Sequence, residues 1–227
     1  MTSLLETLGI TSDPSTPVTE PIVVTATITS VSPDVALVVT ADAREAVLPI
    51  SEWYPNRRWQ VGDVHQMLLM ETTGRPVVST VRPELVEALY HGLVPELLSG
   101  QVRIMSIARS AGLRSKVAVA STGGTADPVA AMIGREANRV KLISSLLEGE
   151  RIDIVAWSPD TQVYLKNALA PARVSRVVIT DRGATAFAPA HQMSAAVGSA
   201  GLNSQLAGQL IGLPVVVAVE DASGETR

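Results

Sequence analysis

The chain contains no cysteine, so its sequence offers no disulfide bonds, no thiolate ligands for zinc or iron–sulfur sites and no cysteine nucleophile. A long apolar segment is missing as well. The longest such run, Leu210–Val219, is interrupted by Gly212 and Pro214 and is about half as long as a membrane-spanning helix. No Lys or Arg precedes Arg44, so the N-terminus lacks the basic start of a signal peptide. We therefore expect a cytoplasmic protein without a membrane segment.

Histidine is scarce, and its placement excludes the common catalytic arrangements. His65, His91 and His191 are far apart in the sequence, so no two of them have the i, i+4 spacing of a metal-binding helix. No P-loop or dinucleotide-binding fingerprint is present. We predict no catalytic residues, no metal site, no cofactor and no small-molecule substrate. Each histidine is interpreted as a surface or capping residue.

The chain does contain enough apolar material for a folded core, because 46% of its 227 residues are hydrophobic and 18% are charged. Its formal net charge of −4 is unevenly distributed, with −7 in residues 1–99, +4 in residues 100–151 and −1 in residues 152–227. Most of the cations are Arg, which binds phosphate through two parallel hydrogen bonds. The basic middle segment is therefore either a nucleic-acid contact or a solvated helix face.

Short β-rich runs with an apolar period near two fill residues 22–81. These runs are 22–28, 35–39, 46–50, 64–70 and 77–81. Turn residues separate them, for example Ser-Pro-Asp at 32–34. Five strands within about sixty residues predict a small closed barrel such as an OB-fold. Residues 1–17, before the barrel, are expected to form a short helix or a tail.

After Pro83 the pattern changes to that of a helix, which should end at Gly100. The segments 83–157 and 158–220 then share one expected order of elements, α-β-β-α-α-β. Each copy has a break between its second and third helices, at Gly134 and at Gly198, and these breaks are 64 positions apart. The sequence therefore predicts an internal duplication.

The break in the second copy reads Gly198-Ser199-Ala200-Gly201, a Gly-x-x-Gly loop between two short helices. Glycines in such a loop allow close approach of the backbone, and the helix that follows directs its N–H groups toward a phosphate. KH domains use this arrangement to clamp single-stranded nucleic acid, while a neighbouring apolar groove receives about four bases. A single Gly-x-x-Gly is common by chance, but its place inside a duplicated unit favours a KH domain.

Four segments resemble the NusA family of bacterial transcription factors, in the same order as in that family. They read VPELLSGQVRIMSIARSAGLRSKVAV, ERIDIVAWSPD, NALAPARVSRVVI and HQMSAAVGSAGLNSQLAGQLIG. The similarity runs from about Val18 to Val219. It implies a multidomain α+β protein that binds nascent RNA and modulates transcription elongation, termination or antitermination. The domains it implies are an S1-type OB barrel at 18–82 and two prokaryotic (type II) KH domains at 83–157 and 158–220, between short tails at 1–17 and 221–227.

The sequence also departs from the NusA pattern. Only about 17 residues precede the barrel, where NusA has a domain that docks on RNA polymerase, so the resemblance implies a shortened protein. The first loop reads Gly134-Arg135-Glu136-Ala137: its second glycine is replaced and an acid has entered. The second loop lacks the basic residue usual in the family, and Gln205 stands where Arg is common. This loss of charge predicts weak RNA binding.

By resemblance, the candidate RNA-binding residues lie at the two loops and in the helices that follow them. They are Ile133, Gly134, Arg135, Arg139 and Lys141 in the first copy, and Val197, Gly198, Ser199, Ala200, Gly201, Asn203 and Gln205 in the second. The loops would meet phosphates, Ile133 and Val197 would floor the base groove, and Arg139 with Lys141 would supply charge. Alternatives stay open: the Gly198 loop is also readable as an inherited structural turn, and Arg139 with Lys141 as a solvated face.

Two function classes follow from these observations. The leading hypothesis is a NusA-like factor that binds single-stranded RNA weakly and in a salt-dependent manner, with RNA polymerase or other transcription factors as candidate partners. The alternative is a protein-interaction module whose RNA face has decayed and whose acidic barrel or KH surfaces contact the transcription or translation machinery. The cluster Trp53–Trp59 mixes aromatics with Arg, as an RNA-stacking surface would, but it aligns with a linker loop in the barrel of the NusA family, and the linker loop is the favoured interpretation. Trp157 is expected to pack between the two KH domains.

Overall fold

The computed structural model describes residues 21–55, 57–124 and 126–220. The expected tails at 1–17 and 221–227, and the barrel boundary at residue 18, lie outside these residues. The structure separates into two compact units. The first contains the residues up to Leu93 with Ala111–Leu113 and Lys141–Arg151, and the second contains Val94–Ser110, Arg114–Val140 and the residues from Ile152. No helix in the part of the chain that is described is long and apolar enough to cross a membrane.

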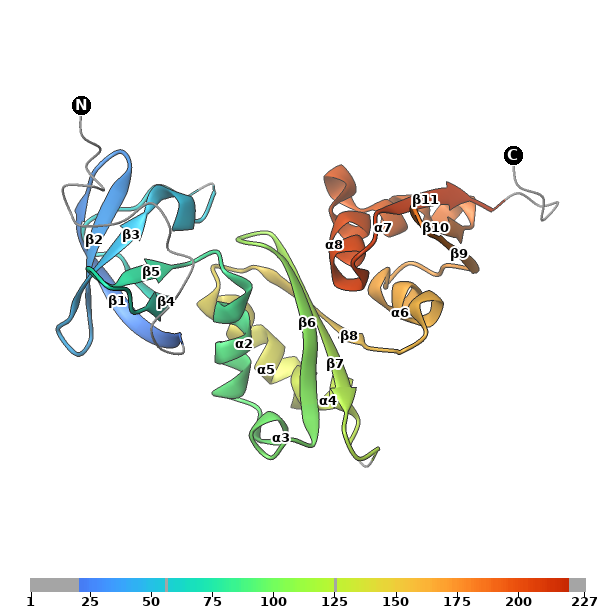
Figure 1. Cartoon of the computed structure of the whole chain (residues 1–227), viewed down its shortest axis with the longest axis horizontal. Helices are drawn as coiled ribbons and strands as arrows, with labels where there is room; N and C mark the ends of the chain where they lie inside the picture. Colours follow the sequence, from blue (N-terminus) through green and yellow to red (C-terminus); the bar gives the residue numbers. More distant parts are fainter. Residues whose placement is uncertain (1–20, 56, 125, 221–227) are drawn as a thin grey trace. The chain divides into compact units, whose positions relative to one another are not determined.

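A closed five-stranded barrel of order β1-β2-β3-β5-β4 forms most of the first unit (Figure 1). Its strands are β1 (Ile22–Val31), β2 (Val35–Thr40), β3 (Glu45–Pro49), β4 (Val64–Met70) and β5 (Val77–Ser79). β3 and β5 pair in parallel and close the barrel, while β1 pairs antiparallel with both β2 and β4. Small or branched inward residues such as Ala26, Val38 and Leu48 fill the interior. The OB-type barrel expected from the sequence is confirmed.

The aromatic residues that follow the short turn η1 (Ile50–Glu52) pack into this barrel. Tyr54 and Trp59 are each 5% exposed, and their rings stack with centroids 6.4 Å apart. The Trp53 indole N–H donates a hydrogen bond to the Leu48 carbonyl at 2.8 Å. The cluster therefore serves the core of the barrel, and its two buried rings are not available for stacking on RNA.

Two helices, α2 (Pro83–His91) and α3 (Pro95–Leu98), replace the single helix expected up to Gly100. The reason is Pro95, which disfavours a helical conformation in the residue before it. Val94 accordingly has φ −115° and ψ 98°, and the chain turns there before α3 begins. In the first unit, α2 packs against β1 and β4.

Two copies of the expected α-β-β-α-α-β order follow, each with a three-stranded sheet (Figure 1). The first copy continues with β6 (Val102–Ser110), β7 (Arg114–Ser121), α4 (Pro128–Ile133), η2 (Arg135–Ala137), α5 (Asn138–Leu146) and β8 (Arg151–Ala156). The second contains α6 (Thr161–Ala168), β9 (Arg176–Thr180), β10 (Gly183–Ala188), η3 (Ala190–Gln192), α7 (Met193–Val197), η4 (Ser199–Gly201), α8 (Leu202–Ile211) and β11 (Val215–Val219). The sheet orders β6-β7-β8 and β9-β10-β11 are the same, which confirms the α+β class and the duplication. We call the two copies the first and the second KH domain, after the fold that the sequence predicts.

Aspartate caps fix where two of these helices begin. The Asp127 carboxylate accepts the N–H groups of Val129 and Ala130 at 3.0 and 3.1 Å, and Pro128 occupies the first turn, where its missing N–H costs nothing. Asp160 caps α6 in the same way.

Within the second unit, one apolar core connects the first KH sheet to the helices of the second KH domain. Ala108, Ala118 and Val155 from β6, β7 and β8 join a buried cluster with residues of α6 and α8. The Tyr164 and Ser106 hydroxyls share a hydrogen bond of 2.8 Å across this contact. Trp157 packs against the same cluster, which contains residues of both KH domains, in agreement with the position expected for it. One face of the first KH sheet is therefore covered by the second KH domain.

Candidate nucleic-acid interface

The two loops between the paired KH helices have the same backbone conformation. Gly134 has φ 75° and ψ 168°, and Gly198 has φ 76° and ψ 171°. Two residues later, Glu136 at φ 54°, ψ 25° corresponds to Ala200 at φ 50°, ψ 27°. The departure of the first loop from Gly-x-x-Gly has therefore not changed the path of its backbone.

The first glycine of each loop is required by packing as well as by its positive φ. A Cβ atom on Gly198 would lie 2.7 Å from the Asn203 Cβ and 2.8 Å from its backbone nitrogen. On Gly134 it would lie 2.7 Å from the Arg139 Cγ. All three distances are shorter than a van der Waals contact allows, so the two helices of each pair approach each other closely only because these residues have no side chain.

The second glycine is required by its backbone angle alone. Gly201 has φ 78°, and a Cβ built on it meets no atom within 4 Å. Ala137 occupies the equivalent position in the first loop and adopts φ 60°. A left-handed alanine costs about 1 kcal/mol, so this replacement is tolerated without a change of shape.

One polar side chain braces each helix pair from the equivalent position of the second helix. In the first copy, Arg139 donates from Nη1 to the Ala131 carbonyl at 2.5 Å and to the Glu96 carboxylate at 3.1 Å. In the second copy, the Asn203 amide donates to the carbonyl of Ala195, which corresponds to Ala131, at 3.2 Å. The same amide also reaches the carbonyls of Ala196 and Leu169, both at 3.0 Å.

These contacts change the interpretation of two candidate residues. Asn203 is fully buried, so it holds α8 against α7 and is not part of the solvent-facing surface. Arg139 is mostly buried and paired with Glu96, so its charge is already compensated inside the domain. Both residues shape the loop from behind.

The other candidates lie at the surface of the loops or just beneath it. Arg135, Lys141, Ser199, Ala200 and Gln205 are exposed, whereas Ile133, Val197, Gly134, Gly198 and Gly201 are half-buried. Arg135 is followed by the exposed acid Glu136, whereas neither exposed residue of the second loop is charged. The second loop therefore presents bare backbone and a hydroxyl, and the first presents one charge of each sign.

Part of the positive charge of the middle segment is internal. Lys116 is fully buried and Arg114 nearly so, and both contact the Asp153 carboxylate, with the Lys116 Nζ at 3.0 Å from Oδ2. Burial opposes ionisation of Asp153, but the two cations outweigh it and lower its pKa. These two cations belong to the core of the second unit and are not a phosphate surface.

A groove of about 520 Å³ lies between α8, the helix that follows the second loop, and the start of β11. Ser204, Gln205 and Gln209 line its helix side, and Val215 lines its strand side. Gly208 also lines the groove. A Cβ at this position would lie 2.8 Å from the Leu213 carbonyl oxygen, so the close approach of these two residues requires glycine. The walls carry hydroxyl and amide groups without formal charge, which suits hydrogen bonding to base edges.

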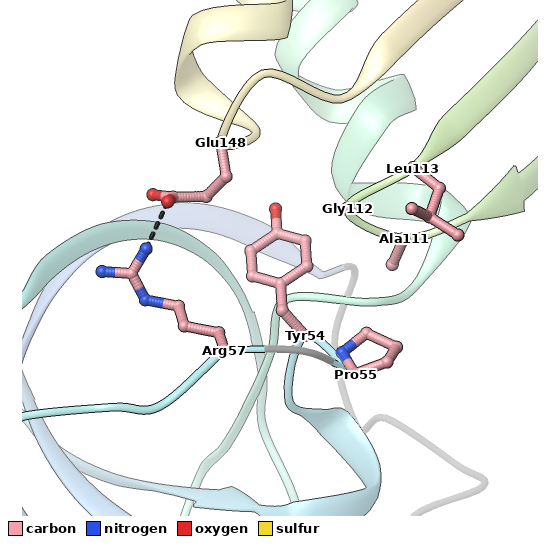
Figure 2. Close-up of a pocket in the computed structure, with 7 residues that line it drawn as sticks. All are labelled: Tyr54, Pro55, Arg57, Ala111, Gly112, Leu113 and Glu148. Carbon is pink, nitrogen blue, oxygen red and sulfur yellow. Dashed lines mark hydrogen bonds and ion pairs between the residues drawn. The ribbon is translucent and has the colours of Figure 1, made fainter.

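A smaller pocket of about 260 Å³ lies in the first unit, away from both loops in sequence (Figure 2). Tyr54, Arg57 and Gly112 line it together with Glu148, and a dashed line marks the Arg57–Glu148 ion pair. Because the Arg57 guanidinium is paired with the Glu148 carboxylate, it is not available to bind a phosphate in this pocket. No group of three His, Asp or Glu side chains that could hold a metal occurs among the described residues.

Comparison with protein families identifies the two repeats. Residues 80–157 match the NusA-like first KH domain, and residues 161–223 match the NusA-like second KH domain. These segments are the two KH domains of a NusA-like protein. The two matches together extend from residue 80 to residue 223 and leave out residues 158–160.

Several curated relatives carry the name transcription termination/antitermination protein NusA. The one from Halalkalibacterium halodurans is 37% identical over 188 residues, which cover 80% of this NusA-like chain and 49% of the relative. Those from Bacillus subtilis and Thermus thermophilus are 36% and 35% identical and are covered to 51% and 46%. The chain thus spans about half the length of these relatives.

Sequence reasoning located both loops of the NusA-like chain but missed the bracing roles of Arg139 and Asn203. A signal for them was present, since both residues occupy the same repeat position, five after the first loop glycine. It also missed the polar groove beside α8, whose signal is Gln205 and Gln209 at i, i+4 spacing on one helix face.

Proposed function

We propose that this chain binds single-stranded RNA, chiefly through the loop Gly198–Gly201 and the groove beside α8, and thereby acts in transcription termination or antitermination as its relatives are named to do. The observation that carries the proposal is the backbone of the second loop. It combines two glycines at positive φ with exposed Ser199 and Ala200, next to a groove without acidic walls. The proposed activity is binding, without catalysis.

The two loops make unequal contributions in this proposal. At the second loop the exposed backbone meets phosphate, Val197 contacts a base, and Ser204 with Gln205 offers hydrogen bonds to base edges. At the first loop we propose that Ile133 contacts a base and that Arg135 and Lys141 contact phosphate. Glu136 repels phosphate there, so the first loop is the weaker of the two.

The low loop charge limits the affinity and its dependence on salt. Cations that neutralise phosphates release counterions and make binding salt-dependent. With Arg139, Arg114 and Lys116 engaged inside the protein, few cations remain near the loops. We propose weak, moderately salt-dependent binding in the cytoplasm, with RNA polymerase or other transcription factors as further partners.

The first test is fluorescence anisotropy of the whole chain with a labelled, unstructured RNA of about four nucleotides at low salt. Ser199→Asp places a carboxylate on the exposed loop surface and should weaken binding about tenfold, because it repels the phosphate that the loop holds. Equal affinities of Ser199→Asp and the unaltered chain, or no binding by the unaltered chain, would contradict the proposal.

Gln162→Asp is the matched control for this substitution. Asn203, just after the loop, bonds to the Leu169 carbonyl at the C-terminal end of α6, whereas the exposed Gln162 is in the first turn of α6. Gln162 therefore lies about 10 Å from Leu169 along the axis of α6. The control adds the same charge to the same domain and should change the affinity by less than about twofold.

A further inference from the structure

The second KH sheet has one face that no helix among the described residues covers. Val177, Ala184 and Ala186 point into the core with α6 and α8. Neighbouring residues of a strand point to opposite faces, so the outward positions belong to the other side of the sheet. We call this side the outer sheet face; it consists of Arg176, Val178, Thr185, Phe187 and Val216. Val178 and Val216 are 37% and 62% exposed, which shows that the face is open.

The equivalent face of the first KH sheet is closed. The matching backbone bonds Trp157 N–H to Val119 O and Glu220 N–H to Ala188 O align β7 with β10, so that Ala118 corresponds to Phe187. Ala118 is fully buried beneath α6 and α8.

The strands opposite Ala118 and Phe187 differ in the same sense. Ser106 is the register partner of Ala118, whereas Arg176 is the register partner of Phe187. In the first domain, α6 and α8 pack closely on the sheet over two small residues, Ala118 and Ser106. The corresponding positions of the second domain carry a large ring and a guanidinium. The outer sheet face is therefore not shaped for another helix pair of this kind.

Arg176 and Phe187 form a stacked pair at the centre of the outer sheet face. The Arg176 Cζ lies 3.9 Å from the centroid of the Phe187 ring. The guanidinium covers the ring, which is 8% exposed, while Arg176 itself stays exposed. A planar cation held flat on an aromatic ring offers its other side to a second planar group, and nucleic-acid bases stack on arginine in this way.

The surroundings of the stacked pair favour a nucleic acid over a protein. The strands β9, β10 and β11 contain no Asp or Glu, and the acid Glu220 follows the end of β11, which β10 separates from the strand that carries Arg176. The Thr185 hydroxyl adds a hydrogen-bonding group beside the pair, because Thr185 precedes Phe187 by two residues on β10.

The outer sheet face is also continuous with the candidate RNA groove. Val215 of β11 lines the groove, and the next residue, Val216, belongs to the outer sheet face. β11 is an edge strand, so a chain leaving the groove meets no further strand before it reaches this face. We infer that RNA bound in the groove passes over β11 and stacks a base on the Arg176–Phe187 pair, an inference that rests on the proposed function.

The test compares two labelled, unstructured RNAs, of about four and about twelve nucleotides, by anisotropy with the whole chain. Arg176→Ala should weaken binding of the longer RNA about tenfold, as expected for the loss of one stacked base, and leave the shorter RNA unchanged. Arg176→Lys keeps the charge but not the planar group, so it should lose nearly as much. Phe187→Leu keeps the apolar volume without the ring and should behave like Arg176→Ala.

Arg182→Ala is the matched control, because Arg182 is an exposed cation in the β9–β10 turn and outside the outer sheet face. It should change the affinity for either RNA by less than about twofold. Arg176 variants that bind both RNAs like the unaltered chain would overturn the inference and leave the face to a protein or to no partner. An equal loss for both lengths would overturn it too. Failure of the proposed function looks different, since the unaltered chain would then not bind even the shorter RNA.

Discussion

The two glycines of the second KH loop meet different physical demands, although a sequence motif treats them alike. Gly198 sits where a Cβ would collide with the backbone and the side chain of Asn203, whose amide nitrogen lies within hydrogen-bond distance of three backbone carbonyls. Gly201 faces open space and is constrained only by its positive φ. The first KH domain shows the same difference. It has Ala137 at the position of the second glycine but retains glycine, Gly134, at the position of the first.

This difference predicts unequal stability effects at the residue scale. Gly201→Ala should lower the free energy of unfolding by about 1 kcal/mol, the cost of a left-handed alanine. Gly198→Ala adds a steric overlap that only a shift of α8 can relieve, so we expect a loss of about 3 kcal/mol or more. Urea unfolding followed by circular dichroism measures both. Equal losses for the two variants would show that packing against Asn203 is not what requires Gly198.

At the scale of elements, local patterns predicted much of what the structure contains. Strand periodicity gave the barrel and both KH sheets, and glycines marked both loops. The split between α2 and α3 was also readable from Pro95, but apolar spacing outweighed it. Burial of Arg114 and Lys116 was not predictable, because a cation in a strand is exposed or internal depending on a partner, Asp153, that is distant in sequence.

His65 on β4 is a second element-scale surprise, since it is enclosed rather than on the surface. Its side chain is 9% exposed, lies 2.9 Å from the Glu148 carboxylate, and meets the Trp59 ring edge-on with centroids 4.8 Å apart. Burial and the positive charge of Arg57 lower the pKa of His65 by more than Glu148 and Asp63 raise it. The folded first unit therefore holds a neutral imidazole at neutral pH.

This pKa shift predicts how the stability of the first unit depends on pH. The unfolded chain, where the pKa of His65 is near 6.5, binds a proton more readily than the folded chain. The stabilisation is fully present above pH 6.5 and is lost as the pH falls through the lower folded pKa. Urea unfolding followed by tryptophan fluorescence should show this loss as the pH falls below about 6.5. His65→Gln should flatten the dependence, whereas the exposed His91→Gln should retain it; a flat profile for the unaltered chain would refute this assignment.

For the whole molecule, the distribution of charge matters more than its sum. The segment 100–151 carries a net charge of +4. Three of its cations, however, form ion pairs with carboxylates of the second unit, namely Arg114, Lys116 and Arg139. The surface near the loops is therefore less positive than the sequence suggests. The two KH loops have the same backbone conformation but little net charge. The conformation of these loops therefore does not depend on basic residues within them.

If charge is what limits RNA binding, restoring it at the weaker loop should strengthen binding. Glu136→Lys replaces the exposed acid of the first loop, at a position whose left-handed backbone is already formed. We expect about tenfold tighter binding to a twelve-nucleotide RNA and a slope of log affinity against log salt that is steeper by about 0.7, the value for one added phosphate contact on a single strand. Anisotropy titrations across a series of salt concentrations measure both quantities.

Asp34→Lys provides the control with the same charge change outside every proposed RNA contact. Asp34 is an exposed residue of the turn between β1 and β2 of the barrel, whereas Glu136 belongs to the second unit. A general electrostatic effect would raise the affinity of both variants alike. A local contact raises only that of Glu136→Lys, with the steeper salt slope. If Glu136→Lys left both affinity and slope unchanged, the first loop would have no part in RNA binding, and the second KH domain would hold the RNA alone.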